Sequence, residues 1–233
     1  MYTQGGRLPC PTVGMCVGFD LDMTLIDPRE GMVPAMRRLA EETGLDLDGE
    51  RFAANLGPPL HQVLRDFGAP EDRIPGLVTR FRDFYPDVVV PRTVALPGAL
   101  AALRAVRDGG GRTLVVTGKY APNAALHVAE LGLPVDTLVG DLWSTGKAAA
   151  LTRHGAVAYV GDHVGDMRGA LAAGAVPIGV ATGPCPREEL LAAGAQVVFD
   201  SLEEFPGWLR LGGLSGSGAP APGPPAPVPD RAG

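Results

Sequence analysis

Short apolar runs and amphipathic stretches alternate along most of the second half of the chain. Apolar runs predict strands at about 15–20, 113–117, 137–139, 157–160, 176–180 and 196–199. Between them, apolar residues at helical spacing predict helices around 100–106 and at about 123–131, 147–153, 167–173 and 188–193. This order predicts an α/β fold, a parallel sheet with helices on both faces. Ligands bind such sheets beyond the carboxyl ends of the strands.

The segment that follows the first strand has a different pattern. Apolar positions such as Met32, Met36 and Leu39, and later Leu77 and Phe81, recur at helical spacing. Strand alternation is not clear there, although residues 87–91 could form a short extended return. We therefore predict a core over 14–26 and 94–211 and an inserted helical cap over 27–93. Residues 1–13 are expected to be a flexible lead-in. The Gly-, Pro- and Ala-rich tail, 212–233, is expected to be disordered.

Composition narrows the classes of protein and partner. The 233 residues suffice for one domain with an insertion, and 45% apolar with 20% charged residues is ordinary for a globular protein. A net charge of −6 argues against nucleic-acid or membrane partners. Three cysteines without a pairing pattern fit reduced thiols, and residues 1–13 do not resemble a secretory signal. We expect a cytoplasmic monomer or homodimer.

Two carboxylates stand where the first strand ends. If the backbone stays extended, Asp20 and Asp22 point the same way. They would repel each other and lose hydration, so a compensating charge is needed. A divalent cation is the simplest compensation, and Mg²⁺ prefers carboxylate oxygens, waters and phosphate. The alternative is a strand that ends in two solvated aspartates.

Further polar residues follow later strands. Thr117 and Gly118 come after the second strand, Lys147 begins a helix, and Asp162 and Asp166 follow a later strand. Each has an ordinary structural explanation, such as a helix cap or a surface lysine. A parallel sheet would bring them together with Asp20 and Asp22 in one polar pocket. That balance of charges suits one divalent cation and one phosphoryl group.

These residues resemble the four motifs of the haloacid dehalogenase-like (HAD) superfamily, with its Rossmann-like core, and within it the phosphoglycolate phosphatase-like phosphatases with a C1 helical cap. The motifs are Asp20-x-Asp22-x-Thr24, then Thr117, then Lys147, then Gly161-Asp162 with Asp166. Two positions depart from the family pattern. Met23 stands where these phosphatases usually have Gly, and Gly118 where Asn or Ser is frequent.

The resemblance implies a role for each motif residue. Asp20 would be the nucleophile and Asp22 the general acid and base. Mg²⁺ would be held by Asp20, Asp162, Asp166 and the backbone carbonyl of Asp22. The phosphoryl group would be held by Thr117, Lys147 and the backbone of Gly118. Thr24 would order the loop, and His163 would not be a metal ligand.

The implied function is a Mg²⁺-dependent phosphatase of a small metabolite, such as a phosphoglycolate-like compound, a sugar phosphate or a nucleotide. A β-phosphoglucomutase-type phosphomutase and a non-catalytic HAD-like binding protein are the alternatives. A dehalogenase would lack the second carboxylate, and a phosphonatase would need a cap lysine, which residues 27–93 do not contain. Six side chains could reach a substrate, but we interpret each as solvated: His61, Arg65, Arg80, Arg82, Tyr85 and Lys119.

Overall fold

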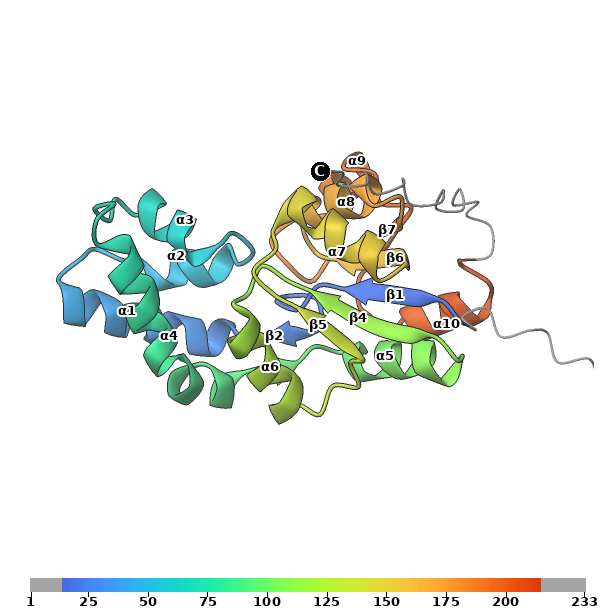
Figure 1. Cartoon of the computed structure of the whole chain (residues 1–233), viewed down its shortest axis with the longest axis horizontal. Coiled ribbons are helices and arrows are strands. Elements are labelled where there is room, and N and C mark those ends of the chain that lie inside the picture. Colours follow the sequence, from blue (N-terminus) through green and yellow to red (C-terminus); the bar gives the residue numbers. More distant parts are fainter. Residues whose placement is uncertain (1–13, 215–233) are drawn as a thin grey trace, which may run out of the picture.

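The computed structural model describes residues 14–214. The lead-in 1–13 and most of the predicted tail, 215–233, lie outside the described residues. One sheet contains β1 (Cys16–Phe19), β4 (Arg112–Val116), β5 (Thr137–Val139), β6 (Ala156–Gly161), β7 (Val176–Val180) and β8 (Val197–Phe199). All neighbouring strands are parallel, in the order β5-β4-β1-β6-β7-β8 (Figure 1). The predicted α/β, Rossmann-like fold is confirmed.

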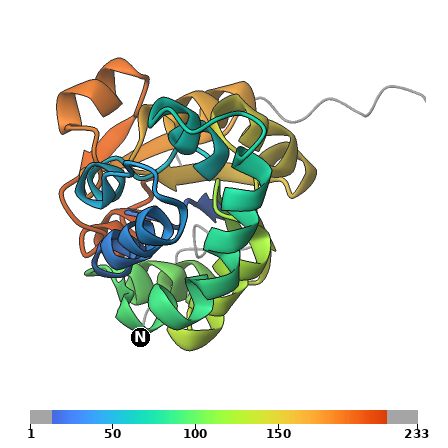
Figure 2. The same cartoon turned by 90° about the vertical axis from the view of Figure 1, so that its left-hand side faces the viewer.

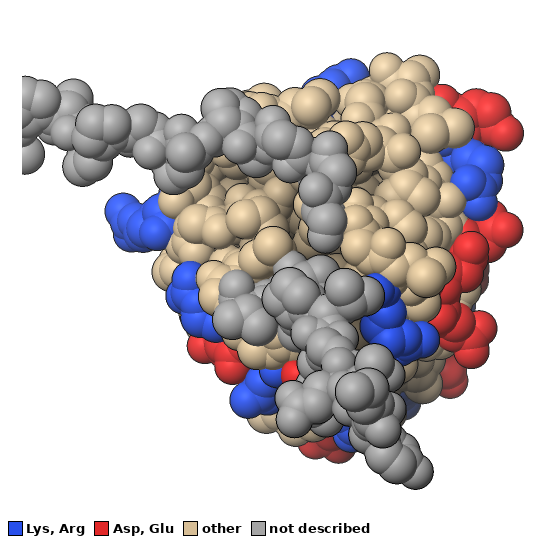
Figure 3. All heavy atoms as spheres, turned by 90° about the vertical axis from the view of Figure 1, so that its right-hand side faces the viewer, with Lys and Arg blue, Asp and Glu red and all other residues tan. Residues whose placement is uncertain are grey.

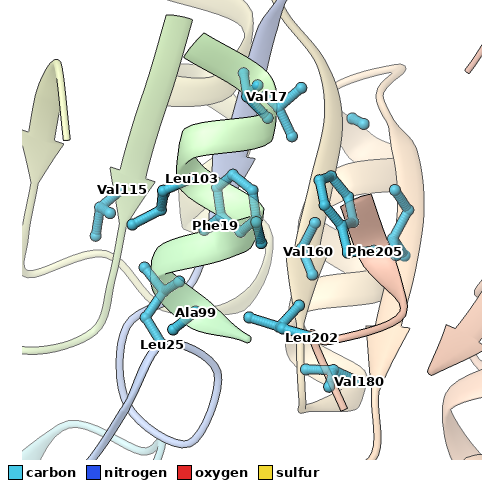
Figure 4. Close-up of a cluster of buried hydrophobic side chains, with 14 of the residues drawn as sticks. Val17, Phe19, Leu25, Ala99, Leu103, Val115, Val160, Val180, Leu202 and Phe205 are labelled. Carbon is cyan, nitrogen blue, oxygen red and sulfur yellow. The ribbon is translucent and has the colours of Figure 1, made fainter. Parts of the chain in front are cut away.

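Helices cover both faces of this sheet. On one face, α5 (Ala99–Asp108), α6 (Ala121–Glu130) and α10 (Phe205–Arg210) pack against Val17, Phe19 and Val160 (Figure 4). The rings of Phe19 and Phe205 meet edge to face at 5.6 Å between centroids. The other face packs against α7 (Ala148–Arg153) and α8 (Val164–Ala172), and α9 (Arg187–Ala192) lies beside α8 against β7 and β8. With both faces covered, the strands are continuous apolar runs.

Four helices between β2 (Ile26–Asp27) and β3 (Val94–Ala95) have an apolar cluster of their own. They are α1 (Arg29–Thr43), α2 (Gly49–Ala54), α3 (Leu60–Asp66) and α4 (Ile74–Val88). We call this unit the cap. It lies beyond the carboxyl end of the sheet (Figures 1 and 2). β2 and β3 pair as an antiparallel ribbon that joins the cap to the core.

Three local features differ from the sequence pattern. Residues 87–91 are not extended, because α4 continues to Val88 and a 3₁₀ turn, Val90–Arg92, follows. The pattern did not predict α10, which contains Pro206 and Gly207; the proline is tolerated because it lies in the first turn. Leu214, three residues past the predicted end of the core, is buried in the same apolar cluster as Val17 and Phe19.

The outer surface carries charges of both signs. Figure 3 shows the end of the core turned away from the cap, where the visible Lys, Arg, Asp and Glu residues lie mainly toward the margin, with uncharged residues between them. Within residues 14–214, each helix is too short or too polar to cross a membrane.

Candidate active site

The motif residues meet where three central strands end. Asp20 follows β1, Thr117 follows β4 and Asp162 follows β6, and β4 and β6 flank β1 on either side. Lys147 is the last residue of a 3₁₀ turn, Ser144–Lys147, that packs against α8. Asp166 lies in the first turn of α8. The parallel register therefore gathers residues that are up to 146 positions apart in the sequence.

The loop after β1 is tightly wound. The Leu21 carbonyl accepts hydrogen bonds from the backbone N–H groups of Leu25 (2.8 Å) and Ile26 (3.0 Å). Within this turn Met23 has φ +58°, a left-handed conformation that costs a non-glycine residue about 1–2 kcal/mol. Its side chain is buried in the cap cluster, and this packing opposes the cost. The Met23 side chain, at the position where the family usually has Gly, therefore connects the Asp20–Asp22 loop to the cap.

Lys147 is the buried cation at the centre of the site. Its Nζ lies 2.9 Å from Asp20 Oδ1 and 2.7 Å from Asp166 Oδ1, and it donates a hydrogen bond of 2.9 Å to the Tyr159 hydroxyl. Burial opposes the charge on Lys147, but Asp166 and Asp20 raise its pKa well above the usual value. Lys147 therefore stays protonated and holds the Asp20 carboxylate in place.

Three buried carboxylates form a candidate metal centre. Oxygen atoms of Asp20, Asp162 and Asp166 all lie within 4.8 Å of one another. Thr24 Oγ1 donates a 2.7 Å hydrogen bond to Asp162, so Thr24 orders this group. Burial, and then the charges of Asp166 and Asp20, raise the pKa of Asp162 well above its usual value. Burial raises the pKa of Asp166 to about 6, although Lys147 opposes the rise.

The donor set of this centre fits a divalent cation. Lys147 pairs with Asp20 and Asp166 but not with Asp162, so three ionised carboxylates would carry more negative charge than this lysine offsets. All the donors are hard oxygens, which suit Mg²⁺. The side chain of Asp22 is outside this cluster, and its predicted contribution through the backbone carbonyl stays a prediction. His163 is also outside it: its Nδ1 accepts the Gly165 N–H at 2.9 Å and caps α8.

Two glycines allow the carboxylates to approach the backbone. A Cβ at Gly161 would lie 2.4 Å from Asp166, and a Cβ at Gly183 would lie 1.8 Å from Asp162 Oδ2. Any side chain would displace these carboxylates. Gly161 is part of the fourth motif and was predicted from the sequence. Gly183 belongs to none of the four motifs, so the sequence did not indicate its place beside the site.

The predicted phosphate-binding residues lie beside the carboxylates. Thr117 is buried, and its hydroxyl accepts the Lys119 N–H at 3.2 Å. Gly118 lies against the cap segment: a Cβ there would lie 3.1 Å from the Gly57 carbonyl oxygen and 3.4 Å from Trp143. The close approach of Gly57 explains why a larger residue at position 118 would be crowded.

A chain of buried polar contacts joins the general-acid candidate to the cap. Asp22 Oδ1 lies 3.0 Å from Lys119 Nζ, without the geometry of a hydrogen bond. Lys119 donates to the Tyr85 hydroxyl, which lies 2.8 Å from His127 Nε2. Burial raises the pKa of Asp22, opposed by Lys119, and burial raises the pKa of Tyr85 to about 12.

Our interpretation of Tyr85 and Lys119 as solvated side chains is therefore wrong, since both are buried. For Tyr85 the sequence held a usable signal, because it lies four residues after Phe81 on the apolar face of α4. Arg65 and Arg80 are bound to Glu71 and Glu42 at the exposed surface of the cap. His61 and Arg82 line the cavity between cap and core.

Comparison with known proteins identifies the family of this chain. The family model described as haloacid dehalogenase-like hydrolase matches residues 17–170, and a second, HAD-hydrolase-like model matches 142–205. The chain belongs to the haloacid dehalogenase-like hydrolases. The predicted superfamily is confirmed.

Relatives of this hydrolase carry phosphatase names. It is 29% identical to Probable phosphatase IndB of Dickeya dadantii, over 81% of this chain and 90% of the relative. It is 30% identical to a phosphoglycolate phosphatase of Caulobacter vibrioides, over 83% and 90% of the two chains. A haloacid dehalogenase-like hydrolase from Streptococcus pneumoniae shares the fold, with a TM-score of 0.74, 20% identity and coverage of 84% and 99%. The predicted assignment to phosphatase-type hydrolases is confirmed.

The buried histidine of this hydrolase predicts a loss of stability in acid. Burial, and then the charge of Lys119, lower the pKa of His127 to about 3. The unfolded chain takes up a proton below about pH 6.5, whereas the folded chain does not, so stability falls between pH 6.5 and 3. This group alone lowers the free energy of unfolding by about 2 kcal/mol between pH 8 and pH 5.

Urea unfolding at several pH values measures this effect. We expect the difference between pH 8 and pH 5 to shrink in His127→Gln. His154→Gln, at the end of α7, is the control and should keep the wild-type difference. An unchanged difference in His127→Gln would contradict the prediction.

Proposed function

We propose that this protein is a Mg²⁺-dependent phosphatase that hydrolyses small phosphomonoesters through an aspartyl-phosphate on Asp20. The observation that carries the proposal is the placement of Asp20: its buried carboxylate is 2.9 Å from Lys147 and belongs to the cluster with Asp162 and Asp166. The phosphatase names of its relatives support the same chemistry.

The metal would be held by Asp20, Asp162, Asp166 and the backbone carbonyl of Asp22. When bound, Mg²⁺ offsets the repulsion between the attacking carboxylate and the phosphoryl oxygens. Lys147 would hold a phosphoryl oxygen while it restrains Asp20. The Thr117 hydroxyl and the Gly118 backbone N–H would donate to the other oxygens.

In the first step, an Asp20 oxygen forms a bond to phosphorus as the bond to the leaving oxygen breaks. Asp22 gives that oxygen a proton, so the product leaves as an alcohol. In the second step, Asp22 takes a proton from water, which attacks phosphorus and releases Asp20. The cap would exclude other water during both steps.

Phosphate release from a panel of phosphomonoesters tests the proposal. The panel includes phosphoglycolate, sugar phosphates and nucleoside monophosphates, each with Mg²⁺ and with EDTA. We expect release with Mg²⁺ and none with EDTA. Release that EDTA leaves unchanged would overturn the metal dependence. Transfer of the phosphoryl group to a second hydroxyl of the substrate would instead indicate a phosphomutase.

Removal of the Lys119 amine is predicted to slow hydrolysis most for esters whose leaving group needs a proton. In Lys119→Met the Asp22 carboxyl loses the neighbouring cation that lowers its pKa and holds it in place, so Asp22 becomes a weaker and less well-positioned acid. We expect kcat to fall about 100-fold for alkyl phosphates and much less for 4-nitrophenyl phosphate, whose leaving group needs no proton. Tyr85→Phe, which keeps the Asp22–Lys119 pair, should have a smaller effect. An equal loss for both kinds of ester would argue against this role.

A further inference from the structure

The cavity beside Asp22 has a mostly apolar lining. It has a volume of about 260 Å³ and lies between cap and core, next to the predicted phosphate-binding Gly118. Its apolar walls come chiefly from the cap: Met32, Phe52, Leu56, Leu60, Val78 and Phe81. Because Asp22 would protonate the leaving oxygen, the rest of the substrate must extend into this cavity.

Every lysine or arginine that lines the cavity faces a carboxylate. Lys119 lies 3.0 Å from Asp22. Arg82 lies 3.7 Å from Asp141, and its guanidinium carbon is 3.7 Å from the centre of the Tyr120 ring. A carboxylate brought in by a substrate would therefore meet only cations that already face a carboxylate, and would gain less from them than it loses in hydration.

Uncharged hydrogen-bonding side chains are few in this cavity. Besides Tyr85, three of them line the cavity, His61, Tyr120 and Asn123, of which Asn123 is buried and His61 is exposed. The Tyr85 hydroxyl is already bonded to Lys119 and His127. A polyhydroxylated sugar would lose more hydrogen bonds to water than these groups replace.

We propose, on the basis of the proposed function, that the substrate is the phosphate ester of a neutral, mainly apolar alcohol, such as a single aromatic ring on a short carbon chain. Its ring would contact Phe52, Leu56 and Phe81, and its oxygen would face Asp22. This substrate class differs from phosphoglycolate, which is named in two relatives, because the two cations of this cavity already lie beside Asp22 and Asp141.

Three benzyl esters of similar intrinsic reactivity test the proposal. Benzyl and 4-methylbenzyl phosphate are neutral beyond the phosphate, and 4-carboxybenzyl phosphate adds one carboxylate. With Mg²⁺, we expect kcat/KM for 4-methylbenzyl phosphate to exceed that for 4-carboxybenzyl phosphate about 100-fold. We expect it also to exceed the values for phosphoglycolate and glucose 6-phosphate.

Asp141→Asn provides a gain-of-function test. It removes the carboxylate beside Arg82, while asparagine tolerates the φ of +60° at this position and can still accept the Ala121 N–H. We expect the kcat/KM ratio of 4-carboxybenzyl to 4-methylbenzyl phosphate to rise about fivefold. An unchanged ratio would overturn the role of charge pairing in substrate choice.

The outcomes separate this inference from the function on which it rests. Equal or faster hydrolysis of 4-carboxybenzyl phosphate, phosphoglycolate or glucose 6-phosphate would overturn the substrate class and leave the phosphatase standing. Absence of Mg²⁺-dependent release from every ester, including the three benzyl esters, would overturn both.

Discussion

Phosphate release by Asp20→Asn is expected to fall on the order of 10⁴-fold or more. The substitution keeps the size of the side chain but replaces the attacking oxygen with an amide. The neighbouring carboxylates cannot substitute for it, because each is held elsewhere: Asp22 by Lys119, Asp162 by Thr24, and Asp166 by Lys147 and the His163 N–H. The measurement is initial-rate phosphate release with saturating Mg²⁺ and the best ester of the panel.

A covalent label gives an independent readout of the same prediction. Acid quenching of wild-type protein mixed with a phosphate-labelled ester should trap label on the chain, and Asp20→Asn should trap none. Asp72→Asn, an exposed cap aspartate, is the matched control and should retain wild-type rates and labelling. Near-normal turnover in folded Asp20→Asn would contradict the role of Asp20 and favour a different nucleophile.

Lys147→Met is expected to reduce both stability and activity. The variant keeps most of the side-chain volume but leaves Asp20, Asp162 and Asp166 buried without their cation. Removing one partner of a buried charge pair costs about 3–5 kcal/mol. We expect that loss in the free energy of unfolding without metal, and a loss of kcat of at least about 1,000-fold, since Asp20 is no longer restrained.

Urea unfolding with EDTA and with Mg²⁺ measures the stability effect. Mg²⁺ should stabilise Lys147→Met, because a ligand that binds only the folded state raises its stability. Arg153→Met, at the exposed end of α7, is the control and should unfold like the wild type. A loss below about 1 kcal/mol in Lys147→Met would show that the carboxylates do not depend on this lysine.

The sequence predicted the sheet and the site's core for one physical reason. Buried parallel strands are apolar along their length, and polar residues can follow only where a strand leaves the core. Asp20, Thr117 and Asp162 stand at three such points, and the sheet order brings these points together. The separation of Asp20 and Asp22 by one residue predicted that both would point the same way if the backbone stayed extended. The chain turns at Leu21 instead, and the Asp22 side chain lies outside the carboxylate cluster, beside Lys119.

Some elements are too short, or too irregular in sequence, for the pattern of apolar residues to predict them. The β2–β3 ribbon has two residues in each strand, fewer than any alternation can reveal. Residues 87–91 contain a run of valines between prolines, which suggests an extended segment. In the structure α4 packs against α1 and α3 of the cap, and the helix continues to Val88.

The sequence by itself determined the parallel sheet and the polar residues at its strand ends, because these follow from local polarity. Lys147 lies in a 3₁₀ turn instead, and the family resemblance predicted its place in the site. Only the tertiary structure decided the surroundings of Asp22. Lys119, Tyr85 and His127 come from the core loop, α4 and α6, and their contacts depend on how the cap helix packs against the core. The pairing of Arg82 with Asp141 has the same origin. The spacing of residues along the chain contains no information on such long-range packing. The pairing of charges in the cavity could therefore be determined only from the tertiary structure.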